Sequence, residues 1–354
     1  MRALVISENL GGRLDEGIRK FATRLVDGLA AHCDATGIAT ESGSDTDSIR
    51  LLAGGKLLRS PLLRAAVAEL APDLVVYVPS ASGTLFSFMR AHSLKRAYPR
   101  AHVAMVLAQM RPHTPPVSRI LRRFSPDTLF CQSPATYAYF EKLRMRPWFL
   151  PSGVDTHRFQ PVSAGYRSVL RRKHGLPQGE YLVFHAGHLT AARNTGLLAQ
   201  LEGVGARGVM LAGSSMGADP RLKTHLEREG VTVIDRYVER VEELYQAADA
   251  YLFPVRTADS AMEFPLSVLE AMACNLPVVA HPYGGLTLAL RAGDGLTFAD
   301  TDEGMLAALV AARDSTEPID TRAQALDLTW DRVAGRLLEA TDVKRDAGTF
   351  AATV

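Results

Sequence analysis

The run from Asp249 to Leu286 places polar side chains at the start of a helical pattern. Its apolar letters AYLF predict a strand, which leads through a loop into the helical pattern SVLEAMA and a further strand, PVVA. Ser267 is the expected N-cap, and Glu270 three residues later completes a capping box. The free N–H groups of such a helix start can bind a diphosphate. Glu270, one turn further on, can accept hydrogen bonds from a ribose, or it caps the helix and does nothing more.

The elements that hold this segment are apolar strands alternating with longer helical patterns. Strands are expected in the first half at 3–6, 74–78, 103–107, 128–131 and 148–150, and helices at about 17–31, 61–70, 84–96 and 134–143. In the second half strands are expected at 181–186, 209–212, 231–234, 250–253, 278–280 and 296–298, and helices near 194–201, 221–229, 241–247, 267–273, 305–313 and 331–341. Continuous apolar strands are typical of parallel sheets covered on both faces. The chain is therefore predicted to be α/β, with two Rossmann-like, doubly wound domains facing a central cleft.

Length and composition agree with two globular domains. The chain has 354 residues, of which 47% are hydrophobic and 22% charged, and a formal net charge of +2 argues against a dedicated nucleic-acid binder. Cys33, Cys131 and Cys274 are too far apart for a zinc motif or a disulfide framework. The N-terminus lacks the features of a signal peptide, and no apolar run approaches the ~20 residues of a membrane span. We therefore expect a cytoplasmic protein, with any membrane contact peripheral.

The run SVLEAMACNLPVVA, followed by PYGG, resembles the donor-binding segment of the retaining glycosyltransferases of family 4, the glycogen synthase-like or group 1 enzymes with the GT-B fold. In that family two Glu residues separated by seven others frame the helix start: the first touches the donor sugar and the second holds the ribose. Glu270 matches the second. The first position falls on Met262, so that either the next residue, Glu263, or Asp259 takes that role; for Glu263 a solvated loop acid is the alternative. The main chain of Phe264, Pro265, Leu266 and Ser267 would then face the sugar and phosphates.

A second resemblance lies in VFHAGHLTAARNTGLL, where the family has Gly-Arg-Leu and, a few residues on, a Lys. The resemblance puts His188 and Arg193 in the positions of the two cations that clamp the diphosphate. Without a metal, such cations must stabilise the leaving group. Arg193 can do so bidentately, whereas the charge of His188 depends on pH. The alternatives are a packed neutral imidazole for His188 and a surface side chain for Arg193.

Three further segments resemble the family more loosely. The linker PSGVDTHRFQP resembles its inter-domain signature, with Gly153 expected in an unusual backbone conformation, and TWDRVAGRLLEAT resembles its closing helix, with Trp330 as a packing residue. In the loop after the first strand, Gly11, Gly12 and Gly17 compete to approach the donor phosphates, and Gly17 is favoured because it directly precedes the helix. The resemblance thus implies an acceptor domain at 1–160, completed by a C-terminal helix at about 329–354, and a donor domain at 161–328.

The resemblance implies a retaining transfer from a UDP- or GDP-sugar to an acceptor hydroxyl or other nucleophile. No cofactor and no metal are expected, and a front-face route, in which the donor phosphate takes the acceptor's proton, is favoured because no carboxylate pair for double displacement is evident. Acceptor-side candidates are Gln109, Arg111 and His113, the last as an orienting or deprotonating group or as a surface histidine. The basic stretch PVSRILRRF, with Arg122 and Arg123, is a solvated helix face or a contact for a membrane or a phosphorylated acceptor.

Other functions remain open at this point. A sugar-nucleotide epimerase or phosphorylase would use the same fold, and a non-catalytic partner subunit would explain Met262 and His188 where the family has Glu and Arg. The base and sugar of the donor, the oligomeric state and the acceptor (a sugar, a glycan, a lipid or a secondary metabolite) are not determined by the sequence.

Overall fold

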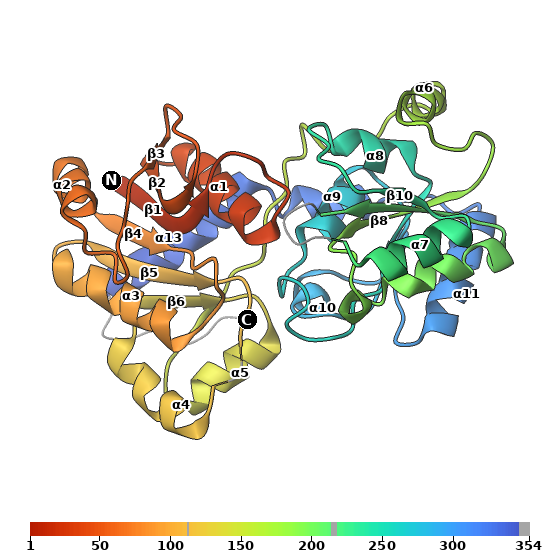
Figure 1. Cartoon of the computed structure of the whole chain (residues 1–354). Coiled ribbons are helices and arrows are strands. Elements are labelled where there is room, and N and C mark those ends of the chain that lie inside the picture. The colour runs from red at the N-terminus through yellow and green to blue at the C-terminus, as the bar shows by residue number, and fades with distance from the viewer. Residues whose placement is uncertain (112, 214–217, 347–354) are drawn as a thin grey trace. The chain divides into compact units, whose positions relative to one another are not determined.

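The computed structural model describes residues 1–111, 113–213 and 218–346. The chain forms two compact units (Figure 1). Unit 1 contains Met1–Gly153, the short segment Met262–Phe264, and the chain from Trp330 onward; unit 2 contains Val154–Ala261 and Pro265–Thr329. The chain therefore enters unit 1 for only three residues, directly before the helix that carries Glu270.

Unit 1 is built on a seven-stranded parallel sheet with the order β3-β2-β1-β4-β5-β6-β7. Its strands are β1 (Arg2–Leu10), β2 (Asp34–Gly43), β3 (Ile49–Leu51), β4 (Leu74–Tyr77), β5 (His102–Leu107), β6 (Thr128–Cys131) and β7 (Trp148–Phe149). Its helices are α1 (Gly17–Ala30), α2 (Pro61–Leu70), α3 (Leu85–Ala97), α4 (Pro115–Leu121), the 3₁₀ turn η1 (Arg122–Phe124), α5 (Pro134–Lys142) and α13 (Trp330–Asp346).

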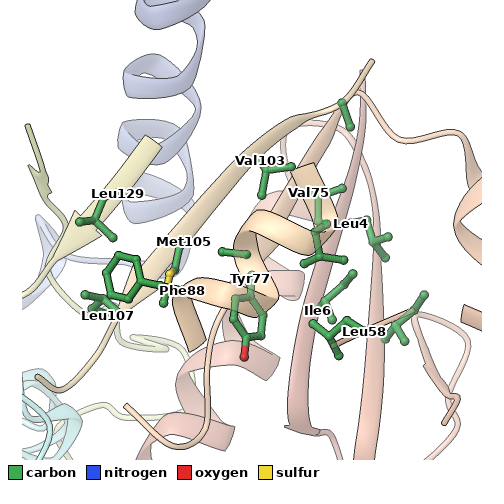
Figure 2. Packing of buried hydrophobic residues seen from close by; sticks show 14 of the residues in the cluster. Leu4, Ile6, Leu58, Val75, Tyr77, Phe88, Val103, Met105, Leu107 and Leu129 are labelled. Carbon is green, nitrogen blue, oxygen red and sulfur yellow. The ribbon is translucent and has the colours of Figure 1, made fainter. Parts of the chain in front are cut away.

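The core of unit 1 explains why its strands read as continuous apolar runs. Figure 2 shows strand side chains such as Leu4 and Val75 in the same buried cluster as Phe88 of α3, which lies beside Met105 and Leu107. On α1 and α13 the packing is close: a methyl group on Gly28 would lie 2.5 Å from the carbonyl oxygen of Trp330. The C-terminal helix is thus part of unit 1 (Figure 1).

Unit 2 is built on a six-stranded parallel sheet with the order β10-β9-β8-β11-β12-β13. Its strands are β8 (Leu182–Gly187), β9 (Arg207–Ala212), β10 (Thr232–Ile234), β11 (Ala250–Phe253), β12 (Val278–Ala280) and β13 (Leu296–Phe298). Its helices are α6 (Ala164–His174), α7 (Pro220–Arg228), α8 (Glu242–Ala247), α9 (Leu266–Ala273), α10 (Leu286–Ala289), α11 (Asp302–Asp314) and α12 (Thr321–Leu326), with 3₁₀ turns η2 (Ala191–Arg193), η3 (Thr195–Gln200) and η4 (Glu202–Val204).

The strand order of unit 2 reverses between β8 and β11, which makes this the switch point of the sheet. β8 pairs with β9 along six residues but with β11 at only two, Ala250 opposite Val183 and Tyr251 opposite Phe184. The two strands diverge towards their carboxyl ends. Ligands of open α/β sheets bind in the crevice that such a divergence creates.

Several expectations about the fold were wrong in detail. β2, β3, α6 and α12 are absent from the sequence-based assignment, and the expected helix from Asn194 is a pair of 3₁₀ turns broken at Asn194, whose φ is 54°. Gly153 does not have a positive φ; its small size matters because a methyl group there would lie 2.7 Å from the Trp330 ring. Among the described helices none is long and apolar enough to cross a membrane.

Candidate functional site

The first part of the site is the N-terminus of α9. The helix begins at Leu266 with Pro265 as its N-cap, and no side chain caps its first N–H groups. Ser267 is therefore the second residue of the helix and not its N-cap, so the predicted capping box is wrong. Pro265 contributes no N–H because its nitrogen lies in the ring. The uncapped first turn leaves N–H groups and the positive end of the helix dipole for an anion.

Glu270 lies in the middle of α9 and not at its N-terminus. Its side chain is buried, with 4% exposed, and its Oε2 accepts a hydrogen bond of 2.8 Å from the Tyr245 hydroxyl. Burial and the neighbouring Glu270 carboxylate raise the pKa of Tyr245 well above its ordinary value, so that the tyrosine remains a donor. Tyr245 thus fixes the orientation of the carboxylate that was predicted to hold a ribose.

Tyr251 of β11 is the point at which the predicted donor residues come together. Its ring is fully buried, and its hydroxyl lies near Ser267 and the main chain of Ala186. Burial raises the pKa of Tyr251, and Glu270 and Arg193 are close enough to act on it electrostatically. The hydroxyl has no hydrogen-bond partner of good geometry among the described residues. Ser267 and Glu270 of α9 and the distant Arg193 therefore all lie near one buried tyrosine of unit 2.

Arg193 approaches the carboxyl end of β8. Its Nε donates a hydrogen bond of 2.7 Å to the carbonyl oxygen of Ser260. A methyl group on Gly187 would lie 2.5 Å from its Nη1, so the guanidinium passes directly over this glycine. His188, the other predicted cation, is half-buried in the turn after β8. Arg193 therefore has a defined hydrogen-bonded position, as expected of a phosphate ligand.

His185 is a residue of the site that the sequence analysis missed. It is fully buried on β8, its Nδ1 lies 2.8 Å from the carbonyl oxygen of Leu252, and its ring stacks on Tyr251. Burial lowers its pKa to about 4, and Arg193 acts in the same direction. The signal was present in the sequence: a histidine interrupts the otherwise apolar strand LVFHAG.

The loop before α9 is held by Tyr283 of the PYGG motif. The Tyr283 hydroxyl donates to the carbonyl oxygen of Ala261 at 2.9 Å and accepts from the Ala261 N–H at 3.3 Å. Asp259, the second candidate for the first Glu position, is exposed in the same loop with a φ of 66°. Tyr283 thereby sets the main-chain path that leads towards the start of α9.

Glu263 and Phe264 belong to unit 1. Glu263 is half-buried: its N–H donates to the carbonyl oxygen of Ala108 at 2.8 Å, and its Oε1 accepts from the Thr136 hydroxyl at 2.5 Å. The alternative of a solvated loop acid is therefore wrong for Glu263. Phe264 is fully buried, and its carbonyl oxygen accepts from the Ser152 hydroxyl.

Gly17, the favoured candidate for a phosphate approach, also packs in unit 1. A methyl group on Gly17 would lie 2.6 Å from the sulfur of Met262. The glycine begins α1, whose N-terminal N–H groups are capped by Glu16 through Ile18 and Arg19. The structure thus gives Gly17 a packing role against the residue at the first Glu position of the family motif.

The acceptor-side candidates lie in unit 1. His113 is half-buried and not on the surface: its Nδ1 lies 3.0 Å from the Tyr139 hydroxyl, with the two rings stacked, and burial lowers its pKa. Gln109 accepts from the Ser82 hydroxyl, and Arg111 is exposed. His113 is therefore neutral at pH 7 and has a fixed ring orientation.

The basic stretch after His113 forms α4 and η1. Arg122 and Arg123 are exposed there, whereas Leu121 packs into the core of unit 1. The structure thus shows an amphipathic segment with a basic outer face.

Comparison with known proteins finds a family match over the segment that carries the unit 2 residues. Residues 184–313 match the family described as "Glycosyl transferases group 1". Among curated proteins the chain is similar to D-inositol 3-phosphate glycosyltransferases, with 28% identity in Geodermatophilus obscurus and 31% in Salinispora arenicola, over 55% and 53% of this chain respectively. The chain's match covers 47% of each relative, so it spans about half the length of the curated proteins it matches.

Solved structures show the same fold over almost the whole chain. Anabaena HepE in complex with UDP and glucose has a TM-score of 0.73 at 15% identity and covers 97% of this chain and 99% of its own. Sucrose-phosphate synthase from Thermosynechococcus elongatus also has a TM-score of 0.73 at 15% identity, covering 97% and 98%. At this identity the likeness concerns the fold. The GT-B fold with two Rossmann-like domains and the resemblance to group 1 glycosyltransferases are confirmed.

Proposed function

We propose that this chain transfers a sugar from a nucleoside-diphosphate sugar to an acceptor hydroxyl. The proposal is supported most directly by the cluster in unit 2, where Arg193, Ser267 and Glu270 surround Tyr251 beside an uncapped helix N-terminus. A helix start and an arginine are both suited to a diphosphate, and a fixed carboxylate is suited to a ribose. The segment 184–313, which matches the group 1 glycosyltransferase family, contains all of these residues.

The donor half would act by positioning and charge. The first N–H groups of α9 and the Arg193 guanidinium would bind the phosphate oxygens and stabilise the charge that develops as the sugar leaves. Glu270, oriented by Tyr245, would accept hydrogen bonds from the ribose hydroxyls. These protein groups can bind the phosphates and the ribose without a metal ion, and we propose that the reaction is metal-independent.

The stereochemical course follows from the family resemblance. We propose retention by a front-face route, in which a donor phosphate oxygen accepts the proton of the incoming hydroxyl while the sugar leaves. Exclusion of water would protect the donor from hydrolysis. In unit 1, His113 is neutral and oriented by Tyr139, which suits a group that orients the acceptor hydroxyl.

Donor and acceptor are proposed only by class. UDP and GDP are both compatible with the diphosphate site; HepE binds UDP, but at 15% identity its base is not transferred to this chain. The curated relatives are named for an inositol phosphate acceptor, whereas the matched family domain lies in the donor half. Sugars, glycans, lipids and secondary metabolites remain candidate acceptors, and the exposed arginines of η1 are compatible with an anionic one.

The test is binding and turnover of nucleotide sugars. Titration calorimetry with UDP and GDP, followed by donor hydrolysis without acceptor, should show binding of at least one nucleotide and its slow release from the sugar nucleotide. Arg193→Ala and Glu270→Gln should abolish turnover with folding retained. The matched controls Arg172→Ala and Glu303→Gln change exposed residues of unit 2 and should behave as wild type. Full activity in both site variants would contradict the assignment.

The same assay separates the rival functions. A non-catalytic partner subunit would bind nucleotide sugar and release nothing, and an epimerase would convert the sugar without releasing the nucleotide. Activity that disappears with EDTA and returns with a divalent metal would overturn the metal-independent mechanism.

A further inference from the structure

His185 occupies the switch point of the donor sheet. It follows Phe184, the last residue of β8 that pairs with β11, and its imidazole lies where the two strands separate. A parallel strand at this depth is ordinarily apolar throughout. A fully buried histidine here needs hydrogen bonds to offset the loss of its hydration.

The hydrogen bond to Leu252 determines which nitrogen of the ring carries the proton. A carbonyl oxygen only accepts, so Nδ1 must donate to it, and in the neutral ring Nε2 is then an acceptor. Nε2 has no hydrogen-bond partner among the described residues. An unsatisfied buried acceptor destabilises the protein unless a donor reaches it.

The guanidinium of Arg193 lies near Nε2 of His185. A methyl group on Gly187 would lie 3.3 Å from Nε2 of His185 and 2.5 Å from Nη1 of Arg193, so both nitrogens border the same glycine. The Nε of Arg193 donates to the carbonyl oxygen of Ser260, which holds the guanidinium beside this glycine.

We propose that His185 is a positioning residue of the donor site, which accepts an N–H of Arg193 and so directs the guanidinium towards a bound diphosphate. The inference rests on the proposed function, since it assumes that Arg193 binds a diphosphate. The proposed hydrogen bond explains why the His185 ring is neutral, because a protonated imidazole would present an N–H to the guanidinium and repel it. It also assigns Gly187 a role, since any side chain there would separate the two groups.

The test is a double-mutant cycle read by calorimetric titration with UDP and GDP. His185→Phe keeps a ring of similar size and removes the acceptor, and His185→Gln replaces Nε2 by a carbonyl oxygen. We expect His185→Phe to weaken binding about tenfold, which is the loss of one hydrogen bond to a charged group. His185→Gln should remain within about threefold of wild type, because its carbonyl oxygen accepts the same hydrogen bond. In an Arg193→Ala background, His185→Phe should change binding less than about twofold, because the partner is already gone.

The control is His225→Gln, at a histidine of unit 2 that is 54% exposed. Equal losses from His185→Phe with and without Arg193 would show a merely structural role and overturn the inference, as would wild-type binding in His185→Phe. A wild-type protein that binds neither nucleotide would instead overturn the proposed function. The two failures are therefore distinguishable in one set of titrations.

Discussion

The pH dependence of stability offers a direct measurement of the buried histidine. His185 has a pKa lowered to about 4 in the folded protein, against an ordinary value of 6.5. Between these two values the unfolded chain binds a proton that the folded chain does not, so the free energy of unfolding falls as the pH falls from 6.5 towards 4. The full difference corresponds to about 3 kcal/mol, and about 2 kcal/mol of it should be lost between pH 7.5 and pH 5.

Other groups also titrate in this range, so the prediction concerns a difference between variants. In His185→Gln the loss of stability between pH 7.5 and pH 5 should be smaller than in wild type by about 2 kcal/mol. The exposed control His225→Gln should retain the wild-type loss. A wild-type pH dependence in His185→Gln would refute the assignment of a neutral, buried imidazole.

The assay must report on unit 2. Both tryptophans, Trp148 and Trp330, belong to unit 1, so tryptophan fluorescence follows the unfolding of that unit. Urea unfolding followed by circular dichroism detects both units, and a transition without a fluorescence change belongs to unit 2. If the two units unfold together, hydrogen exchange of the β8 amides gives the same comparison locally.

The remaining predictions concern the groups that hold the donor residues in place. Tyr245→Phe should remove one hydrogen bond to the buried Glu270 carboxylate, lowering thermal stability and weakening nucleotide binding several-fold in calorimetry; unchanged values in both would count against its orienting role. Tyr283→Phe should loosen the loop before α9 and lower kcat more than it changes the KM for the donor, as steady-state kinetics would show. Gly187→Ala should displace the Arg193 guanidinium and weaken nucleotide binding about as much as Arg193→Ala, with the melting temperature little changed; wild-type binding would contradict the close approach.

Much of the fold was predictable because burial on both faces of a parallel sheet leaves a clear pattern. β4, β6 and β11 are short apolar runs, and α2 begins and ends where its pattern does. β2 was missed because its sequence, DATGIATESG, has no continuous apolar run. Gly and Asp are depleted in strands, and Thr is only partly apolar. α6 was missed because it lies just after the segment PSGVDTHRFQP, which was interpreted as an inter-domain linker.

The site was predictable only where a motif is local. Arg193, Ser267 and Glu270 stood out by type and spacing, but their common neighbour Tyr251 could not, since a tyrosine within AYLF reads as an ordinary strand residue. Ser267 was misassigned as a cap because the helix begins one residue earlier, at Leu266, where the ring of Pro265 sets φ without donating an N–H. His185 was missed because its significance depends on where β8 and β11 separate, which sequence alone does not give.

The donor motif itself is divided between the two units, and this division limits what Glu263 can do. Ala261 and Pro265 belong to unit 2, whereas Met262, Glu263 and Phe264 belong to unit 1, where Glu263 and Phe264 are hydrogen-bonded. The Thr136 hydroxyl already occupies one oxygen of Glu263 at 2.5 Å, so a sugar hydroxyl would have to share or replace that hydrogen bond. Thr136→Val would remove this competitor without changing the size of the side chain. If Glu263 contacts the donor sugar, the variant should alter the KM for the nucleotide sugar but leave the affinity for the free nucleotide unchanged; equal changes in both would show that Glu263 only anchors the segment.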